Sequence, residues 1–331
     1  MKRFWSAIVL GMAAMACAPA WAQSCSASAS AMDFGGVSPI RLAAVDAMGS
    51  VAVTCQWPPQ AGSSRAYAHV CLSLGSGTSS TSLNPRYLAN GGQTMRFNLY
   101  RDAARSQIWG SVLNILVNSP IAVPALRNPS ASSGGTARTT VSYYGRIAAN
   151  QPSVPLINGV ASTYLDNFSG VHTALSVSFD NSSGTPACSV LPVATFPFVV
   201  QAQVINDCTI SATDLNFGSV GVLSQALQAS SSLNVRCTNG NAWRISLSGG
   251  AGGDVLARRM QRVGGSDQVR YQLYTAAARS VIWGDGTGGT SLVSGTGTGQ
   301  AQTVGVFGTV PAQATPRPGT YSDTVIATVN F

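Results

Sequence analysis

The chain has 331 residues, which is enough for two domains of ordinary size, each with its own core. Charged residues make up only 9% of the sequence, against about 25% in an average soluble domain, and this composition disfavours a cytosolic helical enzyme. The formal net charge is +8, but the arginines are scattered rather than gathered with aromatic residues, so a nucleic-acid partner is not expected.

Residues 1–22 predict a cleaved signal peptide. Lys2 and Arg3 precede an apolar run, and Ala-Trp-Ala at residues 20–22 supplies the small residues of a cleavage site. A membrane anchor would need about 20 uninterrupted apolar residues, which neither this segment nor any later one has. We therefore expect an exported chain with no membrane span, whose mature form begins at Gln23.

The cysteines of the mature chain predict disulfides, because an even number in an exported protein is typical of a disulfide framework. They are Cys25, Cys55, Cys71, Cys188, Cys208 and Cys237. The first two lie 30 positions apart and the last two 29, so the simplest pairing joins each of these pairs and leaves the middle two for each other. Zinc is disfavoured because there is no C-x-x-C pair and there are only two histidines. We expect no cofactor.

One block of sequence occurs twice. RFNLYRDAARSQIWG at residues 96–110 returns as RYQLYTAAARSVIWG at residues 270–284. A Phe-Gly pair also follows the first cysteine of each half, at residues 34–35 and 217–218. Short alternating segments between Gly-rich turns are typical of an antiparallel β-sandwich. The sequence therefore predicts an all-β chain with two sandwich domains in tandem.

An apolar stretch distinguishes the first repeat, at a place where the second repeat has a polar Gly-Thr-Ser loop. Its apolar residues are Val112, Leu113, Ile115, Leu116, Val117, Ile121, Val123 and Leu126. Two interpretations stay open: a strand packed into the core, or an exposed loop for surface attachment, since large exposed apolar patches mark interaction sites. Two Pro-bearing segments, 56–59 and 152–157, are candidates for further apolar tips beside it.

The two halves end differently. In the first, the alternating segment 173–179 is followed by another at 198–204. In the second, the last strand places Val325, Ala327, Val329 and Phe331 on one face. We expect 198–204 to close the first domain, and the alternative is that it opens the second. If 198–204 closes the first domain, the second domain exposes a bare strand edge at these four residues. Another chain must then cover this edge.

The combination of Cys-x8-Phe-Gly, the block at 270–284 and PGTYSDTVIATVNF at 318–331 resembles the spore coat protein U-type domain of archaic chaperone-usher pili. The resemblance covers residues 206–331 nearly end to end and the first half more loosely. It implies immunoglobulin-like pilin domains, the second lacking its last strand. It also implies folding with a periplasmic chaperone and polymerisation at an outer-membrane usher, where an adjacent pilin subunit donates a strand.

On this resemblance we expect a signal peptide at 1–22, an N-terminal adhesin domain at 23–193, a linker at 194–206 and a C-terminal pilin domain at 207–331. Pilins of this type donate a strand from an extension ahead of the first cysteine, but only Gln23 and Ser24 precede Cys25 in the expected mature chain. We therefore expect a subunit at the pilus tip on the cell surface, which attaches to an abiotic or host surface and supports biofilm formation.

Two other functions are alternatives to the tip adhesin. One is a non-adhesive minor pilin or secreted coat component, and the other is a carbohydrate-binding lectin domain on a pilin base. Catalysis is not expected, because His69 and His172 are the only imidazoles and neither lies in a nucleophile motif. Asp166 and Asp323 follow equivalent tyrosines in the two halves, and such recurrence indicates a role in the fold rather than in an active site.

Overall fold

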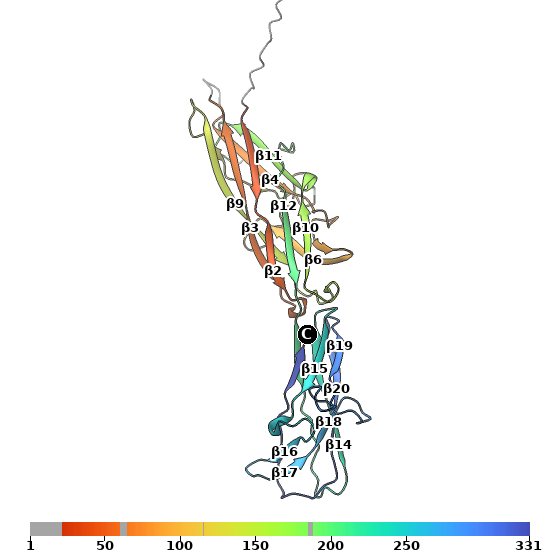
Figure 1. The fold of residues 1–331 in the computed structure, drawn as a ribbon. Helices are drawn as coiled ribbons and strands as arrows, with labels where there is room; N and C mark the ends of the chain where they lie inside the picture. Colours follow the sequence, from red (N-terminus) through yellow and green to blue (C-terminus); the bar gives the residue numbers. More distant parts are fainter. Residues whose placement is uncertain (1–21, 60–64, 115, 185–187) are drawn as a thin grey trace, which may run out of the picture.

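The computed structural model describes residues 22–59, 65–114, 116–184 and 188–331. Nearly all of its regular structure is β-strand, and the chain forms two bodies placed end to end (Figure 1). Each body has its own hydrophobic core. Residues 1–21 of the expected signal peptide lie outside the described residues. In the described part, no helix has the length and apolar character needed to span a membrane.

The first body consists of two packed sheets. Its strands are β1 (Ser24–Ala29), β2 (Met32–Val37), β3 (Val45–Trp57), β4 (Tyr67–Leu74), β5 (Arg86–Asn90), β6 (Gln93–Tyr100), β7 (Ile121–Ala122), β8 (Leu126–Arg127), β9 (Gly135–Ile147), β10 (Ser162–Phe168), β11 (Thr173–Asp180) and β12 (Phe198–Val204). The larger sheet has the order β1-β3-β9-β6-β5-β10-β12-β2, and the smaller has β11-β4-β7 with β8 also on β4. Two short 3-10 turns, Pro39–Arg41 and Gly170–His172, lie outside the sheets.

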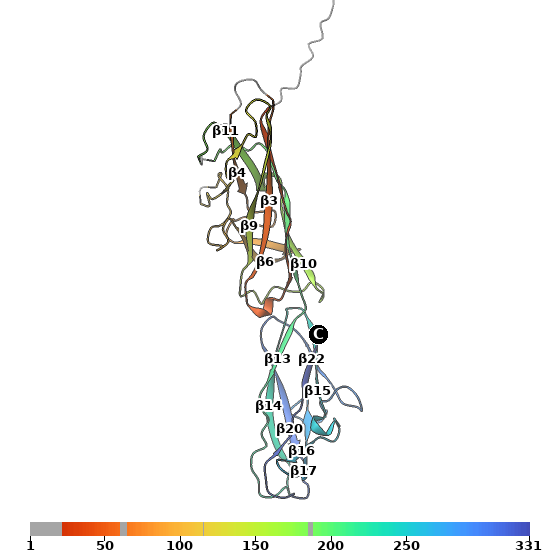
Figure 2. The ribbon, with the colours of Figure 1, turned by 90° about the vertical axis from the view of Figure 1, so that its left-hand side faces the viewer.

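The second body repeats this plan with shorter strands. They are β13 (Cys208–Ala212), β14 (Leu227–Cys237), β15 (Ala242–Leu247), β16 (Arg259–Arg262), β17 (Gln268–Arg270), β18 (Gln272–Tyr274), β19 (Val293–Thr296), β20 (Gln302–Val310), β21 (Tyr321–Ser322) and β22 (Ala327–Asn330), with a 3-10 turn at Gly250–Gly252. They form three sheets, β13-β14-β20-β18, β19-β15-β22 and β17-β16-β21. Figure 2 shows both bodies from the side, with β13 and β14 continuing below β6 and β10.

The cysteines of the described chain form three disulfides, as the repeat spacing predicted. Cys25 pairs with Cys55, and Cys208 pairs with Cys237, in each case between residues directly opposite each other on neighbouring strands. The third disulfide joins Cys71 on β4 to Cys188, in the segment that leads to β12. Two disulfides are thus copies of one feature, and the third ties the approach to β12 to the first body.

A buried arginine occupies the same place in each body. Arg86 is fully buried and donates hydrogen bonds to the carbonyl oxygens of Gly75 and Trp109 and to Oδ1 of Asn98. Arg258 likewise donates to the carbonyl oxygen of Trp283 and to a side-chain amide oxygen. Burial lowers the pKa of Arg86 to about 9. These guanidinium groups satisfy carbonyls of the segments that cross between the sheets, so they hold the layers together.

Strand β12 completes the first body. It pairs antiparallel with β10 along its whole length, from Phe168↔Phe198 to Ser162↔Val204, and parallel with β2 on its other side. Its alternating side chains Phe198, Val200, Ala202 and Val204 are all buried in the first core. Period-2 alternation of this kind is what a half-buried strand requires.

Polar contacts join the two bodies where β12 leads into β13. Three residues separate these strands, and among them Asp207 accepts hydrogen bonds from Arg41 Nε at 2.7 Å and from Ser38 Oγ at 2.7 Å. Asn239 of the second body accepts a hydrogen bond from the backbone N–H of Leu156 and donates one to the carbonyl of Ser153. A short linker with contacts on both sides holds the bodies end to end.

Candidate functional site: an open strand edge and an exposed apolar turn

The repeat identifies which segments of the second body correspond to the neighbours of β12. On the first body these neighbours are β2 and β10. The Phe-Gly pairs align β2 with residues 215–220, and the Tyr-x-Asp motifs align β10 with residues 319–325. The pairing registers agree, because Leu165 of β10 pairs with Ala89, and Ser322 of β21 pairs with Gln261, the residue equivalent to Ala89.

Among the described residues, no strand lies between these two segments as β12 lies between β2 and β10. In the part of the chain that the structure describes, β21 pairs only with β16, and residues 215–220 belong to no strand. We call residues 215–220 and 319–325 the open edge.

The position of 215–220 nevertheless matches that of β2. A Cβ placed on Gly308 would lie 2.8 Å from Phe217 Cζ and 3.0 Å from Leu215 Cδ1. A Cβ on the equivalent Gly145 would lie 2.8 Å from Phe34 Cζ. Both Phe rings therefore lie over equivalent glycines of the sheet. This holds in the first body, where β12 lies beside β2, and in the second, where the described residues provide no such strand.

Burial differs between the two bodies at these positions. Met32, Phe34 and Val37 of β2 are 1%, 7% and 4% exposed. Their equivalents Leu215 and Phe217 are only half-buried, and Val220 is 49% exposed. Facing them, Tyr164 and Phe168 of β10 are fully buried, whereas the equivalent Tyr321 and Val325 are half-buried. The open edge therefore exposes apolar surface that β12 covers in the first body.

The sequence predicted the bare edge at Val325, Ala327, Val329 and Phe331, and of these residues only Ala327 and Val329 lie in a strand. Val325, Ala327 and Val329 are half-buried against the second core, and Phe331 is 54% exposed. Ala327 and Val329 lie on β22, which pairs with β15 and corresponds to β11 rather than to β10. Only Val325 lies on the open edge. Leu215 and Phe217 escaped the sequence analysis, although Phe217 belongs to the Phe-Gly motif.

The apolar stretch after Trp109 divides into an exposed turn and buried strands. Ile121, Val123 and Leu126 are 7%, 6% and 7% exposed, so of the two open interpretations the core strand holds for these three. The reason is pairing with β4, where Ile121 lies opposite Leu72 and Leu126 opposite Ala68.

The preceding part of the stretch is a turn on the surface. Leu113 and Leu116 are 64% and 88% exposed, Val112 and Val117 are half-buried, and Ile115 lies outside the described residues. Asn114 Oδ1 accepts hydrogen bonds from the backbone N–H groups of Leu116 and Val117, and the N–H of Val112 donates to Ser73 Oγ. The two exposed leucines thus project from a turn with defined hydrogen bonds. We call residues 111–114, 116 and 117 the apolar turn.

Most apolar side chains of the two Pro-bearing segments are covered in the described part of the chain, although Pro59 is exposed. Trp57 and Pro58 are buried, and Trp57 Nε1 donates a hydrogen bond to the carbonyl of Arg65. Val154 and Leu156 are each 5% exposed and lie at the junction with the second body. Their apolar side chains serve the first core and the junction instead.

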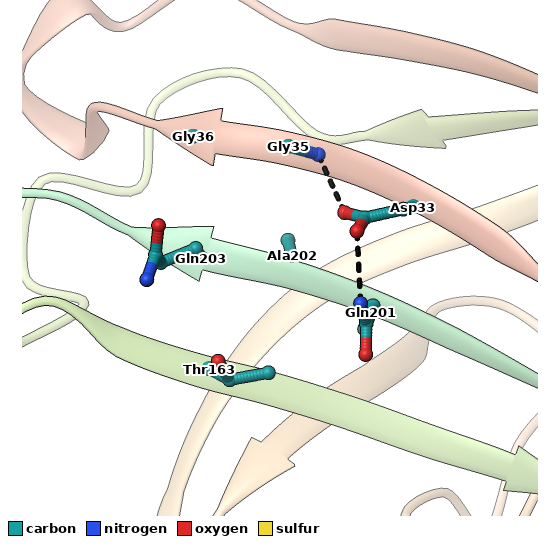
Figure 3. Close-up of a pocket in the computed structure, with 7 residues that line it drawn as sticks. All are labelled: Asp33, Gly35, Gly36, Thr163, Gln201, Ala202 and Gln203. Atoms are coloured by element: carbon teal, nitrogen blue, oxygen red, sulfur yellow. Dashed lines mark hydrogen bonds between the residues drawn. The ribbon is translucent and has the colours of Figure 1, made fainter.

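A shallow pocket of about 210 Å³ lies on the outer face of β2, β12 and β10 (Figure 3). Asp33 Oδ2 accepts a hydrogen bond from Gln201 Nε2 at 2.8 Å, and Asp33 Oδ1 accepts one from the backbone N–H of Gly35 at 2.7 Å. The β2–β12 register shifts between Gln201 and Gln203. Asp33 therefore links the side chain of the closing strand to the Phe-Gly turn.

His69 and Asp166 have structural partners in the described chain. His69 Nε2 lies 2.9 Å from Asp180 Oδ1 and within hydrogen-bonding distance of the carbonyl of Ser182. Burial raises the pKa of Asp166, whose Oδ1 accepts hydrogen bonds from the loop at Thr78 and Ser79. The described residues hold no group of three or more His, Cys, Asp or Glu side chains that would suit a metal ion.

Comparisons with known proteins identify the relatives of this fold. Protein U of Myxococcus xanthus is 36% identical over 129 residues, which cover 35% of this chain and 71% of that protein. The CsuC-CsuE chaperone-tip adhesion subunit complex from archaic chaperone-usher Csu pili of Acinetobacter baumannii matches with a TM-score of 0.50 at 18% identity, covering 93% of this chain and 100% of the matched one. The CupB6 tip adhesin from Pseudomonas aeruginosa matches with a TM-score of 0.38 at 12% identity, covering 92% and 93%.

The match to the chaperone-tip adhesion subunit complex agrees with an all-β chain of immunoglobulin-like sandwiches. The model of the Spore Coat Protein U domain family matches residues 12–168 and 194–328, which include most of both bodies. The chain belongs to the Spore Coat Protein U domain family.

Proposed function

We propose that this chain is the adhesive subunit at the tip of an archaic chaperone-usher pilus, where it mediates surface attachment and biofilm formation. One observation carries the proposal. Strand β12 fills the first body from within the chain, whereas the equivalent segments of the second body have no such strand among the described residues. A body that is already closed is free to contact a surface, and a body with an open edge connects to a fibre.

The proposed domain boundaries follow the two hydrophobic cores. The adhesin domain comprises residues 23–193, the linker 194–206 contributes β12 as its closing strand, and the pilin domain comprises 207–331. The first core includes Phe198, Val200, Ala202 and Val204 of the linker, which supports the assignment of this strand to the adhesin domain.

The second body needs a strand from another polypeptide. Half-buried Leu215, Phe217 and Tyr321 flank an unpaired backbone edge, and such edges aggregate unless they are covered. Strand addition covers them, since main-chain hydrogen bonds provide affinity and alternate side chains fill the space between the segments. We propose that a periplasmic chaperone supplies this strand first, and that an adjacent pilin replaces it at the outer-membrane usher. The solved complex of the CsuE subunit with its chaperone supports this order by analogy.

Attachment is assigned to the apolar turn. Leu113 and Leu116 are among the most exposed large apolar side chains of the first body, and burial of one leucine against a greasy surface is worth about 1.5–3 kcal/mol. Many pili on one cell multiply weak contacts into firm attachment. An abiotic or host surface with exposed hydrocarbon is therefore the proposed target.

Adhesion of cells to polystyrene tests this assignment. The double variant Leu113→Ser, Leu116→Ser is expected to lose attachment while pili still assemble. The matched control is Leu256→Ser, Val281→Ser, which removes two exposed apolar side chains of the second body, 49% and 41% exposed, and is expected to attach normally. Equal attachment by both variants would contradict the role of the apolar turn.

Immunogold labelling tests the position in the fibre. Antibodies to the first body should label pilus ends only. Labelling along the shaft would instead favour a minor pilin. The lectin alternative is favoured if free sugars abolish attachment of the natural chain and the Leu113→Ser, Leu116→Ser variant still attaches.

A further inference from the structure

We infer that the strand which completes the second body is selected by its register, with a small residue facing Tyr321 and a polar residue facing Asn216. This inference rests on the proposed function, because it specifies the strand that the open edge accepts. The chain contains its own template for that strand, since β12 occupies the equivalent position in the first body.

The template assigns a partner to every inward position of the incoming strand. In the first body Phe198 lies opposite Phe168, Val200 opposite Asp166, Ala202 opposite Tyr164 and Val204 opposite Ser162. The repeat maps these four β10 residues onto Val325, Asp323, Tyr321 and Gly319. The incoming strand would run antiparallel to 319–325 and parallel to 215–220, as β12 runs relative to β10 and β2.

The position that faces Tyr321 requires a small side chain. In the first body Ala202 faces Tyr164, and both are fully buried. The hydroxyl of Tyr164 donates a hydrogen bond to the carbonyl of Pro155 at 2.7 Å, which holds the ring on the inner face. Tyr321 makes the equivalent bond to the carbonyl of Arg317 at 2.6 Å. Directly opposite side chains in an antiparallel pair are about 5 Å apart at Cβ, so a fixed ring leaves room for alanine but not for leucine.

The position next to it requires a polar side chain. In the first body Gln201 donates to Asp33, whose other oxygen accepts from the N–H of Gly35 (Figure 3). Asn216 is the equivalent of Asp33, and its Oδ1 accepts from the N–H of Gly218 at 2.8 Å. The turn therefore already holds the Asn216 side chain as it holds Asp33.

An amide in place of the carboxylate widens the choice of partner at this position. Asn216 both donates and accepts hydrogen bonds, so the incoming residue need not be a donor as Gln201 is. This contact lies on the exposed face and favours one register of the incoming strand. The position facing Tyr321 lies on the buried face and excludes strands that carry a large side chain there.

A peptide with the sequence of residues 196–205, FPFVVQAQVI, is the probe, carrying a charged solubilising tail and a fluorophore. It is titrated into the mature full-length chain and followed by fluorescence anisotropy. Saturable binding is expected, with hydrogen-exchange protection appearing at 215–220 and 319–325. The tethered β12 holds the first body at a far higher effective concentration, so the peptide is directed to the second.

Peptide variants test the register without altering the protein. Replacement of the alanine equivalent to Ala202 by leucine should weaken binding at least tenfold, whereas serine at the same position should change it less than threefold. Replacement of the glutamine equivalent to Gln201 by valine should weaken binding three- to tenfold for the natural chain but not for the Asn216→Val chain. A scrambled peptide should not bind.

The outcomes separate this inference from the proposed function. Equal binding of the alanine and leucine peptides overturns the register rule but leaves the open edge in place. The same holds if no peptide binds while a chaperone that co-purifies with the chain protects 215–220. If 215–220 and 319–325 are fully protected from exchange in the isolated chain, the second body needs no strand, and both the inference and the proposed function fail.

Discussion

Substitution of Phe198 by alanine is the most direct test that β12 belongs to the first body. The Phe198 side chain is 6% exposed. Its ring is stacked on Phe168 at 4.9 Å and lies 5.4 Å from the ring of Tyr143 and 6.2 Å from that of Trp109. Truncation of a buried phenylalanine costs about 3–5 kcal/mol, because the transfer energy of the ring is lost and a cavity remains. Whole domains are stable by only about 5–15 kcal/mol.

Hydrogen exchange followed by mass spectrometry assigns this loss to one body. Every 1.4 kcal/mol corresponds to a factor of about ten, so the slowest amides of β3 and β9 should exchange roughly a hundred to several thousand times faster in Phe198→Ala. The slowest amides of β14 and β20, in the second body, should be unchanged. The measurement uses the mature full-length chain with its disulfides intact.

The control is Phe331→Ala, the same chemical change at a side chain that is 54% exposed. Exposed substitutions usually change stability by about 0.5 kcal/mol or less, so neither set of amides should change markedly. The reasoning is refuted if Phe198→Ala leaves β3 and β9 unchanged, and more strongly if it accelerates exchange in β14 and β20 instead. Either result would return residues 198–204 to the second body.

The remaining predictions concern the third disulfide, the buried arginine and the junction. The pair Cys71→Ser, Cys188→Ser opens a link between residues 117 apart and should lower the free energy of unfolding in urea by roughly 4–5 kcal/mol. Arg86→Met leaves several buried acceptors without a donor and should lower the free energy of unfolding by at least about 3 kcal/mol in the same assay. High salt should not change the size of this loss. Burial raises the pKa of Asp207, but hydrogen bonds from Arg41 and a neighbouring serine outweigh this and lower it. Its stabilising contribution is therefore complete above the unfolded pKa of about 3.9 and is lost as the pH falls through the lower folded value; the thermal midpoint should drop in that range, and Asp207→Asn should remove this part of the drop.

Much of the fold was predictable from the sequence because the chain repeats itself. The spacing of Cys25 to Cys55 recurs in the second half, and in both halves the paired cysteines lie opposite each other on adjacent strands. Period-2 alternation identified the segments 173–179 and 198–204 as strands, since this pattern depends only on neighbouring residues. Local patterns were therefore sufficient wherever the structure depends on local geometry.

The apolar stretch after Trp109 shows where local patterns fail. Leu113 and Ile121 are equally apolar in the sequence, yet one is 64% exposed and the other 7%. The difference arises because Ile121 lies opposite Leu72 of β4, about fifty positions earlier, whereas Leu113 lies in a turn that hydrogen bonds to itself. Alternation gives the face of a strand but not its partner, so it does not separate the buried part of such a stretch from the exposed part.

The bare edge expected from the sequence differs from the open edge for a related reason. The alternating pattern of the last strand predicted an edge that includes Val329 and Phe331. The two segments of the open edge are instead 215–220 and 319–325, which lie about a hundred positions apart. The Tyr-x-Asp motif aligns 319–325 with 162–168 in the sequence, but only the pairing of β10 with β12 shows that this segment flanks the closing strand. Register between distant strands is information that a single sequence does not display.

The repeat also shows which part of the chain makes one body closed and the other open. Both bodies have the Phe-Gly turn, the Tyr-x-Asp motif and the buried arginine with its carbonyl partners, so none of these features explains the difference in burial between Tyr164 and Tyr321. What differs, in the part of the chain that the structure describes, is whether a strand lies between the two motifs. β12 supplies it to the first body, and three residues later the same chain begins β13 of the second. A strand that stands directly ahead of one sandwich and completes the sandwich before it is the arrangement by which a fibre grows through strand donation. The link between the two bodies therefore already has, within one chain, the connectivity that we propose between the second body and the next subunit.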